Sequence, residues 1–321
     1  MSAAPAAVTA AALRRLDALA AERGITLLGD APLAPLTTLR VGGAADRMLA
    51  AATRDQLLAG LRLARDAGVA CFVLGNGSDV VVADAGMRGL VIRNRARAVA
   101  LDGLELRADA GTPMALLVRR CVAEGLAGLE FATSIPGTLG GAVWANAGAH
   151  GAEMRELISL VEVWDPRVDR LGSLDAESCA FAYRESRFKH SGEIVLVATL
   201  RLRRDDPTAV AARVAANQAQ RVATQPLADQ NAGSVFRNPP GDHAGRLIDV
   251  AGLKGARVGS ASVSERHANF IITDRAGRAA DVRALGERVR GEVLARFGVE
   301  LAYEIEFVGD WPTDDPSGGA S

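Results

Sequence analysis

The sequence predicts a mixed α+β protein with a larger first part and a smaller second part. Strand and helix signals alternate through the first two thirds of the chain. A polar stretch that ends in proline, residues 203–207, interrupts them, and a second set of signals follows. Of the 321 residues, 49% are hydrophobic and 23% are charged, which is ample material for a buried core.

Charge and cysteine content exclude several classes of function. The chain has 37 basic and 38 acidic residues, and no basic stretch that could form a nucleic-acid-binding face. No window has the roughly 18 consecutive apolar residues of a membrane span, and the alanine-rich start lacks the leading positive charge of a signal peptide. The cysteines show no C-x-x-C spacing. We therefore expect a cytoplasmic protein with buried thiols, and no disulfide, metal site, nucleic acid or membrane insertion.

Helix and turn signals define the first part in order. After a loose start, an amphipathic helix is expected, and then a helix at residues 53–68, where Thr53 and Gln56 form a capping box. Thr112 as N-cap and Pro113 in the first turn are typical of a third helix, which Gly125 ends. Strands are expected at residues 71–74 (buried), 80–82, 91–92, 158–163 and 194–202.

The second part begins with a helix to about residue 223. A long helix follows, in which apolar side chains recur at helical spacing up to Gly298. Residues 300–308 alternate between apolar and polar, which predicts a strand. We expect the tail, residues 310–321, to be disordered.

A glycine-rich loop, residues 75–79, joins two of the expected strands. Glycine pairs let backbone N–H groups approach an anion closely. A plain tight turn is the alternative, and from this segment alone it is favoured. A Rossmann fingerprint is disfavoured, because position 80 is Val and a strand follows.

A longer run of small residues covers 134–151, with three glycines and a proline among its first eight residues. A run with so little side-chain bulk is typical of a place where the backbone contacts a large, flat ligand. A close crossing of helix and strand is the alternative. We favour ligand contact, because it also explains the glycine loop at 75–77.

Three further segments carry reactive polar groups. Ser234 follows a glycine at a strand start, where a serine often only caps a turn. Glu304 lies on the acidic face of the last expected strand, and a solvated face suits its neighbours Glu300 and Glu306. Residues 183–189 are rich in hydrogen-bond donors, although on their own they are typical of a surface loop.

Seven segments, in this order, resemble the UDP-N-acetylenolpyruvoylglucosamine reductase family and together span nearly the whole chain. They are residues 38–43, 75–79, 135–148, 183–186, 231–239, 263–270 and 304–309. The resemblance implies an α+β fold with a two-subdomain FAD-binding region of the vanillyl-alcohol-oxidase type and a smaller α+β substrate-binding domain. The implied division is a lead-in at 1–30, an FAD-binding domain at 31–206 with subdomains 31–95 and 96–206, and a substrate-binding domain at 207–309.

The resemblance also implies non-covalent FAD, NADPH as hydride donor, and an enolpyruvyl sugar nucleotide as substrate. Arg184 and Glu304 would stabilise negative charge on the substrate carboxylate, Arg184 through its planar fork and Glu304 as a proton-bearing or water-relayed donor. Ser234 would protonate the carbanionic carbon. The implied cofactor-binding residues are Arg40, Gly75, Asn76, Gly77, Ser78, Asp79, Ser134, Ile135, Pro136, Gly137, Gly140, Gly141, Asn146 and Gly148. The candidate substrate-binding residues are Tyr183, Arg221, Arg237, Asn238 and His267.

The chain departs from the family pattern at several positions. Asp79 and Thr37 stand where Asn is usual, and we expect Asp79 to turn away from the cofactor and bond backbone. With two tyrosines and Thr224 in place of a lysine, the chain resembles the branch without a substrate-capping tyrosine loop. We expect a monomer.

Two other functions stay open. One is another flavin oxidase or dehydrogenase on the same scaffold, acting on a sugar or hydroxy acid. Many such enzymes attach FAD through His or Cys, and His150 is the only such residue in the glycine-rich run. The other is a nucleotide-binding regulatory module, which would lack a flavin spectrum.

Overall fold

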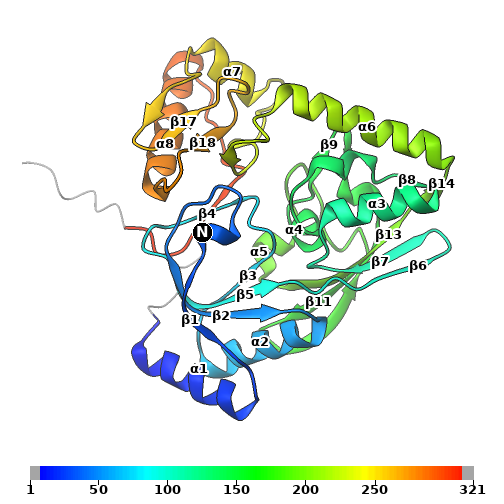
Figure 1. Cartoon of the computed structure of the whole chain (residues 1–321), viewed down its shortest axis with the longest axis vertical. Helices are drawn as coiled ribbons and strands as arrows, with labels where there is room; N and C mark the ends of the chain where they lie inside the picture. Colours follow the sequence, from blue (N-terminus) through cyan, green and yellow to red (C-terminus); the bar gives the residue numbers. More distant parts are fainter. Residues whose placement is uncertain (1–7, 313–321) are drawn as a thin grey trace, which may run out of the picture.

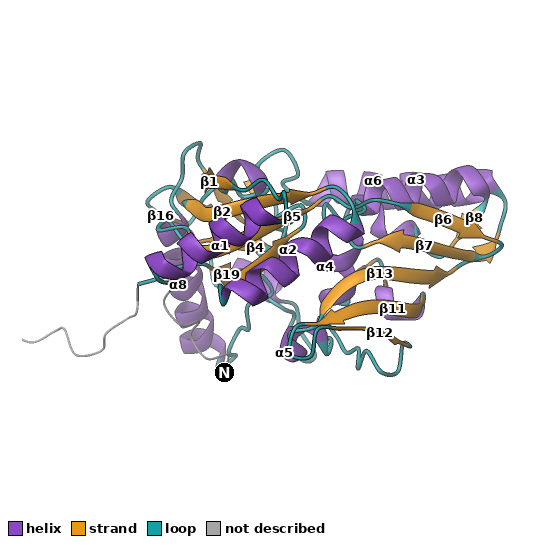
Figure 2. Ribbon diagram, turned by 90° about the horizontal axis from the view of Figure 1, so that it is seen from below, coloured by secondary structure: helices purple, strands orange, loops and turns teal. Residues whose placement is uncertain are grey.

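The computed structural model describes residues 8–312, which form three larger sheets with helices packed on them (Figures 1 and 2). The lead-in helix α1 (Ala10–Glu22) begins after Thr9, whose hydroxyl accepts a hydrogen bond from the Ala12 N–H. It packs against α2 (Arg54–Ala67) beside the first sheet. Within residues 8–312, every helix is too short or too polar to cross a lipid bilayer.

The first sheet has the strand order β1-β2-β5-β3. Strand β5 pairs in parallel with β2 and β3, whereas β1 is antiparallel to β2. The bounds are β1 (Leu28–Pro32), β2 (Ala44–Ala51), β3 (Cys71–Leu74) and β5 (Met87–Asn94).

Helix α2 confirms most of the expectation for residues 53–68. Leu57, Leu61 and Ala64 bury one face in a core shared with α1 and the first sheet. The Thr53 hydroxyl accepts from the Gln56 N–H at 3.2 Å, but the Gln56 amide oxygen bonds Ala52, so only half of the capping box forms. Gly68 ends the helix in the left-handed conformation.

The second sheet is antiparallel throughout, with the order β12-β11-β13-β7-β6. Helices α3 (Met114–Glu124) and α4 (Leu139–Trp144) share its core. The strands are β6 (Val99–Asp102), β7 (Glu105–Asp109), β11 (Ile158–Asp165), β12 (Arg170–Leu174) and β13 (Ile194–Arg201).

Helix α6 (Pro207–Thr224) leads away from this sheet, and its N-cap Asp206 accepts from two backbone N–H groups. The third sheet follows, in the order β15-β18-β17-β16, and α7 (Ala244–Val250) and α8 (Ala279–Phe297) pack with it (Figure 1). Its strands are β15 (Gln230–Asn231), β16 (Arg257–Val258), β17 (Ala261–Val263) and β18 (Ile271–Thr273).

The last strand returns to the first part of the chain. Strand β19 (Glu306–Val308) pairs in parallel with β4 (Val80–Val82). The expected strand at residues 300–308 is therefore wrong in length. Residues before β19 instead bond the segment after Ser234, where Glu304 N–H donates to Val235 at 2.8 Å.

Three smaller expectations are also corrected. Helix α3 begins after Pro113, and the buried Thr112 hydroxyl has no hydrogen-bond partner among the described residues, so Thr112 is not the N-cap. Cys71 is exposed rather than buried. Trp311 packs on Phe307 at 5.4 Å, so the start of the expected disordered tail is ordered, while residues 313–321 lie outside the described part.

The remaining elements are short. They are η1 (Ala34–Leu36), β8 (Leu126–Ala127), η2 (Glu130–Ser134), β9 (Gly148–Ala149), β10 (Ala152–Glu153), η3 (Met154–Glu156), α5 (Phe188–Ser191) and β14 (Arg203–Arg204).

Candidate active site

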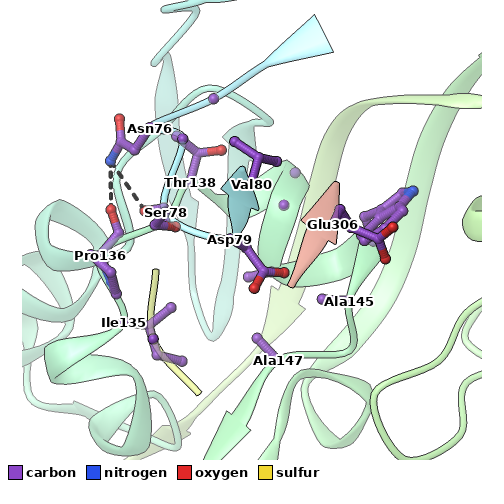
Figure 3. A pocket seen from close by; sticks show the side chains of 18 of the residues that line it. Asn76, Ser78, Asp79, Val80, Ile135, Pro136, Thr138, Ala145, Ala147 and Glu306 are labelled. Carbon is purple, nitrogen blue, oxygen red and sulfur yellow. Dashed lines mark hydrogen bonds between the residues drawn. The ribbon is translucent and has the colours of Figure 1, made fainter. Parts of the chain in front are cut away.

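A cavity of about 720 Å³ is lined by residues of the first and second sheets, by segments next to β15 and β18, and by both glycine-rich segments (Figure 3). The end of α6 and the segment with Ser234 also line it. Arg184, Ser234 and Glu304, far apart in sequence, all face this one cavity. Of the expected cofactor residues it contains Gly75, Asn76, Gly77, Ser78, Asp79, Ile135, Pro136, Gly137, Gly140, Gly141 and Gly148.

The loop after β3 is shaped by tight packing. Gly77 has φ +60°, and a Cβ there would lie 2.6 Å from the Leu36 carbonyl oxygen. The Thr38 N–H donates to the Gly77 carbonyl at 2.9 Å. Asn76 Nδ2 donates to the Pro136 carbonyl at 2.8 Å and so ties the two glycine-rich segments together (Figure 3). The loop is therefore more than a tight turn, because its backbone bonds Thr38 and its Asn76 side chain bonds Pro136, in two different segments.

The second glycine-rich segment, residues 134–151, contains both a close crossing with a neighbouring segment and positions open to a ligand. At Gly140 a Cβ would meet Ala110 at 2.8 Å, which is the close crossing considered as an alternative. At Gly141 the nearest atom is 3.9 Å away, so that position opens on the cavity. Ser134 ends η2, and its side chain lies outside the described part of the chain.

Arg184 stands in a tight turn in which Ala182 and Glu185 exchange backbone hydrogen bonds. Its φ of 54° is unusual for a residue with a side chain and indicates a position imposed by its surroundings. Arg184 Nε donates to Glu304 Oε1 at 2.6 Å, and Nη2 donates to the Gly148 carbonyl at 2.7 Å. Two N–H donors of the Arg184 guanidinium are therefore bonded within the protein. A substrate carboxylate must accept hydrogen bonds from the remaining N–H groups.

Asn146 holds this turn and does not line the cavity, contrary to the expected cofactor contact. Its side chain is fully buried, and Nδ2 donates to the Ala182 carbonyl at 2.8 Å and to Glu153 at 3.1 Å. Its Oδ1 accepts from the Arg155 N–H at 3.0 Å. The hydrogen bonds of the Asn146 amide therefore hold the turn that contains Arg184.

Ser234 lies beside Glu304 because the Glu304 N–H donates to the next carbonyl after Ser234, that of Val235. On the other side, the Val235 N–H donates to the Asn269 carbonyl at 2.8 Å. The segment is therefore held from two directions. Ser234 lines the cavity, so its position is compatible with proton donation into it.

Two cavity features were missed or misread in the sequence. Within residues 8–312, the Asp79 carboxyl makes no hydrogen bond to backbone; it lines the cavity, and burial together with Glu304 and Glu306 raises its pKa well above the usual range (Figure 3). Glu306, taken as a solvated residue, lines the cavity too. The alternation of residues 300–308 places Glu306 on the same face as Glu304, so the signal was present.

Lys189 is a third residue that the sequence did not single out, although it belongs to the donor-rich run at residues 183–189. Its side chain is 8% exposed, and Nζ lies 3.6 Å from Glu306 Oε1 and 4.3 Å from the centre of the Trp144 ring. This cation therefore lies beside the acidic cavity residue Glu306. His150 also lines the cavity.

The candidate substrate residues divide between two places. Arg221 lines the main cavity beside Gln225, whose side chain accepts from its Nε at 2.9 Å, and burial lowers the pKa of Arg221. Tyr183, Arg237 and Asn238 line a separate hollow of about 530 Å³.

Two expected contacts lie outside both hollows. His267 packs edge-on against Phe270 at 4.8 Å, and burial lowers its pKa. The Arg40 side chain is exposed, while its backbone N–H donates to the Thr37 hydroxyl at 3.1 Å. Arg40 therefore belongs to the turn packed beside Gly77 rather than to the cavity lining.

Comparison with known proteins bears on both parts of the chain. Residues 225–308 match the UDP-N-acetylenolpyruvoylglucosamine reductase C-terminal domain, and residues 45–167 match an FAD binding domain. UDP-N-acetylenolpyruvoylglucosamine reductase 2 of Symbiobacterium thermophilum is 44% identical over 89% of this chain and 93% of its own length. The reductase of Moorella thermoacetica is 44% identical over 92% of this chain and 99% of its own.

The chain belongs to the UDP-N-acetylenolpyruvoylglucosamine reductase family. The crystal structure of the Thermus caldophilus reductase matches with a TM-score of 0.75 at 35% identity, covering 90% of this chain and 99% of that one. The expected α+β fold class is confirmed, and the chain is an FAD-dependent oxidoreductase.

The cavity of this family member fits FAD. Two glycine-rich segments, residues 75–79 and 135–141, line the cavity with backbone, and backbone N–H groups suit an anionic diphosphate. Gly141 leaves open space at the cavity wall. Small or apolar side chains, among them Ile135, Ala145 and Ala147, line the region beyond (Figure 3). Asp79, directly after the glycine-rich loop at residues 75–78, is an acidic lining residue that opposes an anion there.

Proposed function

We propose that this chain reduces UDP-N-acetylenolpyruvoylglucosamine to UDP-N-acetylmuramate with NADPH, a step in peptidoglycan precursor synthesis. The observation that carries the proposal is the meeting of Arg184, Glu304 and Ser234 in the cavity that fits FAD. The family supports the choice of substrate, since its curated relatives are named for this reduction.

FAD held by residues 75–79 and 135–141 would supply the transfer of a hydride from NADPH to the vinyl carbon of the enolpyruvyl group. Negative charge then develops on the neighbouring carbon and its carboxylate. Arg184 meets this charge with N–H groups that Glu304 and Gly148 leave free. One preorganised donor of this kind is worth roughly 3 kcal/mol of transition-state stabilisation.

Glu304 acts first as the acceptor that orients Arg184. Both side chains are mostly buried, at 18% and 20% exposure, so the guanidinium is held in one place before the substrate arrives. Orientation in advance is what makes an electrostatic contribution large, because no reorganisation is needed during the reaction. Donation by Glu304 itself would require a proton or a bridging water.

Ser234 supplies the proton that completes the product. Its Oγ donates to the carbanionic carbon, and position matters more than acidity because that carbon is a strong base. The two backbone bonds of the next residue, Val235, support this role, since they fix the backbone from which the Ser234 side chain reaches the cavity.

The substrate nucleotide needs cationic and donor groups away from the reacting carbon. We infer that Arg221, in the main cavity, bonds the diphosphate, and that the hollow of Tyr183, Arg237 and Asn238 receives the rest of the nucleotide. Tyr183 and Asn238 are joined across this hollow by a hydrogen bond of 3.4 Å. His267 and Arg40 have no place in this proposal.

The enzyme is further proposed to act in the cytoplasm as a monomer, without a tyrosine-bearing loop over the substrate. Tyr303, one of its two tyrosines, supports the last point, because its hydroxyl donates to Glu287 at 3.0 Å. The other, Tyr183, lies next to Arg184 in the same turn.

Anaerobic stopped-flow spectroscopy tests the function directly. Purified protein should be yellow, should bleach on mixing with NADPH, and should regain its colour on mixing with UDP-N-acetylenolpyruvoylglucosamine. Acid precipitation should release the flavin intact, which distinguishes this enzyme from oxidases with covalent FAD. Reduced flavin that the enolpyruvyl substrate fails to reoxidise would refute the proposal, and a colourless protein would favour a nucleotide-binding module.

A further inference from the structure

Five charged side chains meet beside β4 and β19. Arg184 pairs with Glu304 at 2.6 Å, and Lys189 Nζ lies 3.6 Å from Glu306 Oε1. Each of these two cations is thus assigned to one carboxylate. Asp79 is the third carboxylate of the group and makes no ion pair or side-chain hydrogen bond within residues 8–312 that would stabilise its charge.

Strand pairing fixes the backbone of Asp79 beside this group. Its backbone carbonyl accepts from the Glu306 N–H at 2.9 Å, and Val80 directly after it is in register with Glu306. The parallel pairing of β4 with β19 therefore holds the Asp79 carboxyl near two others. With all five groups ionised, three negative charges would face two positive ones, and one proton removes the excess.

Other charged groups of the cavity do not compensate Asp79. Glu193 is paired with Arg187 at 2.8 Å, and Arg221 stands on α6 with its Nε bonded to Gln225. His150 is on the loop after β9. The charged groups that act on Asp79 are Glu304 and Glu306, which disfavour its ionised form, and Lys189 and Arg184, which favour it less strongly.

Bound FAD would make the excess of negative charge around Asp79 more unfavourable. Asp79 is exposed only in part, and it lines the cavity that FAD fills, so bound FAD displaces water from the carboxyl. Its diphosphate adds further negative charge near residues 75–78. An ionised Asp79 would be repelled, whereas a protonated one offers an O–H donor.

We propose that Asp79 binds FAD as a neutral carboxylic acid whose proton is donated in a hydrogen bond to the cofactor, so that FAD is held tightly only while Asp79 is protonated. Asp79 is then a cofactor-binding residue, and it makes FAD retention dependent on pH. The inference rests on the assignment of the cavity to FAD.

The sign of the dependence follows from linkage. Because FAD binds the protonated form, its Kd is constant at low pH and rises once pH exceeds the pKa of Asp79 in the free protein. One proton gives a limiting slope of about tenfold in Kd per pH unit. The rise stops where Asp79 ionises even in the complex.

The test dilutes the holoenzyme across a pH series and follows released FAD by its fluorescence. Wild-type protein should show the rise in Kd, and Asp79→Asn, whose amide donates at every pH, should show a flat Kd close to the wild-type value at low pH. Asp79→Ala should bind weakly at every pH. The exposed Asp102→Asn, a matched loss of one charge, should keep the wild-type dependence.

Two results would overturn the proposal: an Asp79→Asn protein with the wild-type slope, or a wild-type Kd that falls as pH rises, as expected if an ionised carboxylate were the ligand. Infrared difference spectra of the wild type give an independent readout. They should show the C=O band of a protonated carboxyl that changes when FAD is released, and its absence contradicts the proposal even if the variants do not fold. Protein that retains no FAD at any pH would instead refute the cofactor assignment.

Discussion

Arg184 Nε donates to Glu304 Oε1 at 2.6 Å across 120 residues of chain, and both side chains face one cavity. The contact joins a turn beside the second sheet to the segment that precedes β19. Any shift of one part against the other would therefore misplace the guanidinium. This dependence makes the pair a sensitive point for mutation.

Ser234→Ala should separate the two half-reactions. Reduction of the flavin by NADPH should stay near the wild-type rate, whereas reoxidation by the enolpyruvyl substrate should fall by about 10²–10⁴, because only the second step needs the proton. Stopped-flow absorbance measures both. Ser173→Ala, an exposed change on β12, is the control. Equal losses in both half-reactions would make Ser234 structural.

Arg184→Lys should slow reoxidation by about 10² or more while leaving FAD bound. A single ammonium cannot bond Glu304 and Gly148 in the same geometry and still present a planar N–H group to a carboxylate. The exposed Arg167→Lys is the matched control. Near-normal reoxidation in Arg184→Lys would show that the fork geometry is unimportant.

Asn146 should matter for both stability and the Arg184 turn. Its amide makes three buried hydrogen bonds at φ 44°, so Asn146→Ala loses the bonds and also strains the backbone. Asn146→Gly loses only the bonds, and should lower the free energy of unfolding by about 1–3 kcal/mol. Denaturant unfolding of the pair separates the two effects. Unchanged stability in both variants would contradict the network.

Glu130 should contribute stability that is lost in acid. Burial opposes its ionisation, but backbone N–H groups, including that of Gly128 at 2.6 Å, and Arg213 lower its pKa below the ordinary 4.5. A lowered pKa in the folded state means that the contribution is complete above the unfolded pKa and declines as pH falls through the folded one.

Glu130→Gln should therefore lower the free energy of unfolding at pH 7, with the difference from wild type shrinking below about pH 4.5. Urea unfolding at several pH values measures this. The partly exposed Glu124→Gln on α3, which loses only an i,i+4 pair, should differ little from wild type. A difference independent of pH would indicate that packing, not charge, is responsible.

Much of the fold was predictable from the sequence because the signals are local. Helix α2 with its Thr53 cap, the end of α8 at Gly298 and the start of α6 after Asp206 each depend on residues within a few positions of one another. The last strand was overpredicted for the same reason. Alternation is a local pattern, whereas pairing needs a partner, and β4 offers one to only three residues.

The sequence by itself determined the longer helices α1, α2, α3, α6 and α8, the two backbone-exposing segments and, through seven motifs in order, the family. Only the tertiary structure decided which polar side chains share a cavity. It placed Asn146 behind Arg184, left Arg40 outside, and set Asp79 beside Glu306 through the pairing of β4 with β19. The physical reason is that charge and burial act through space, so the state of a carboxyl such as Asp79 depends on neighbours that long-range strand pairing brings together.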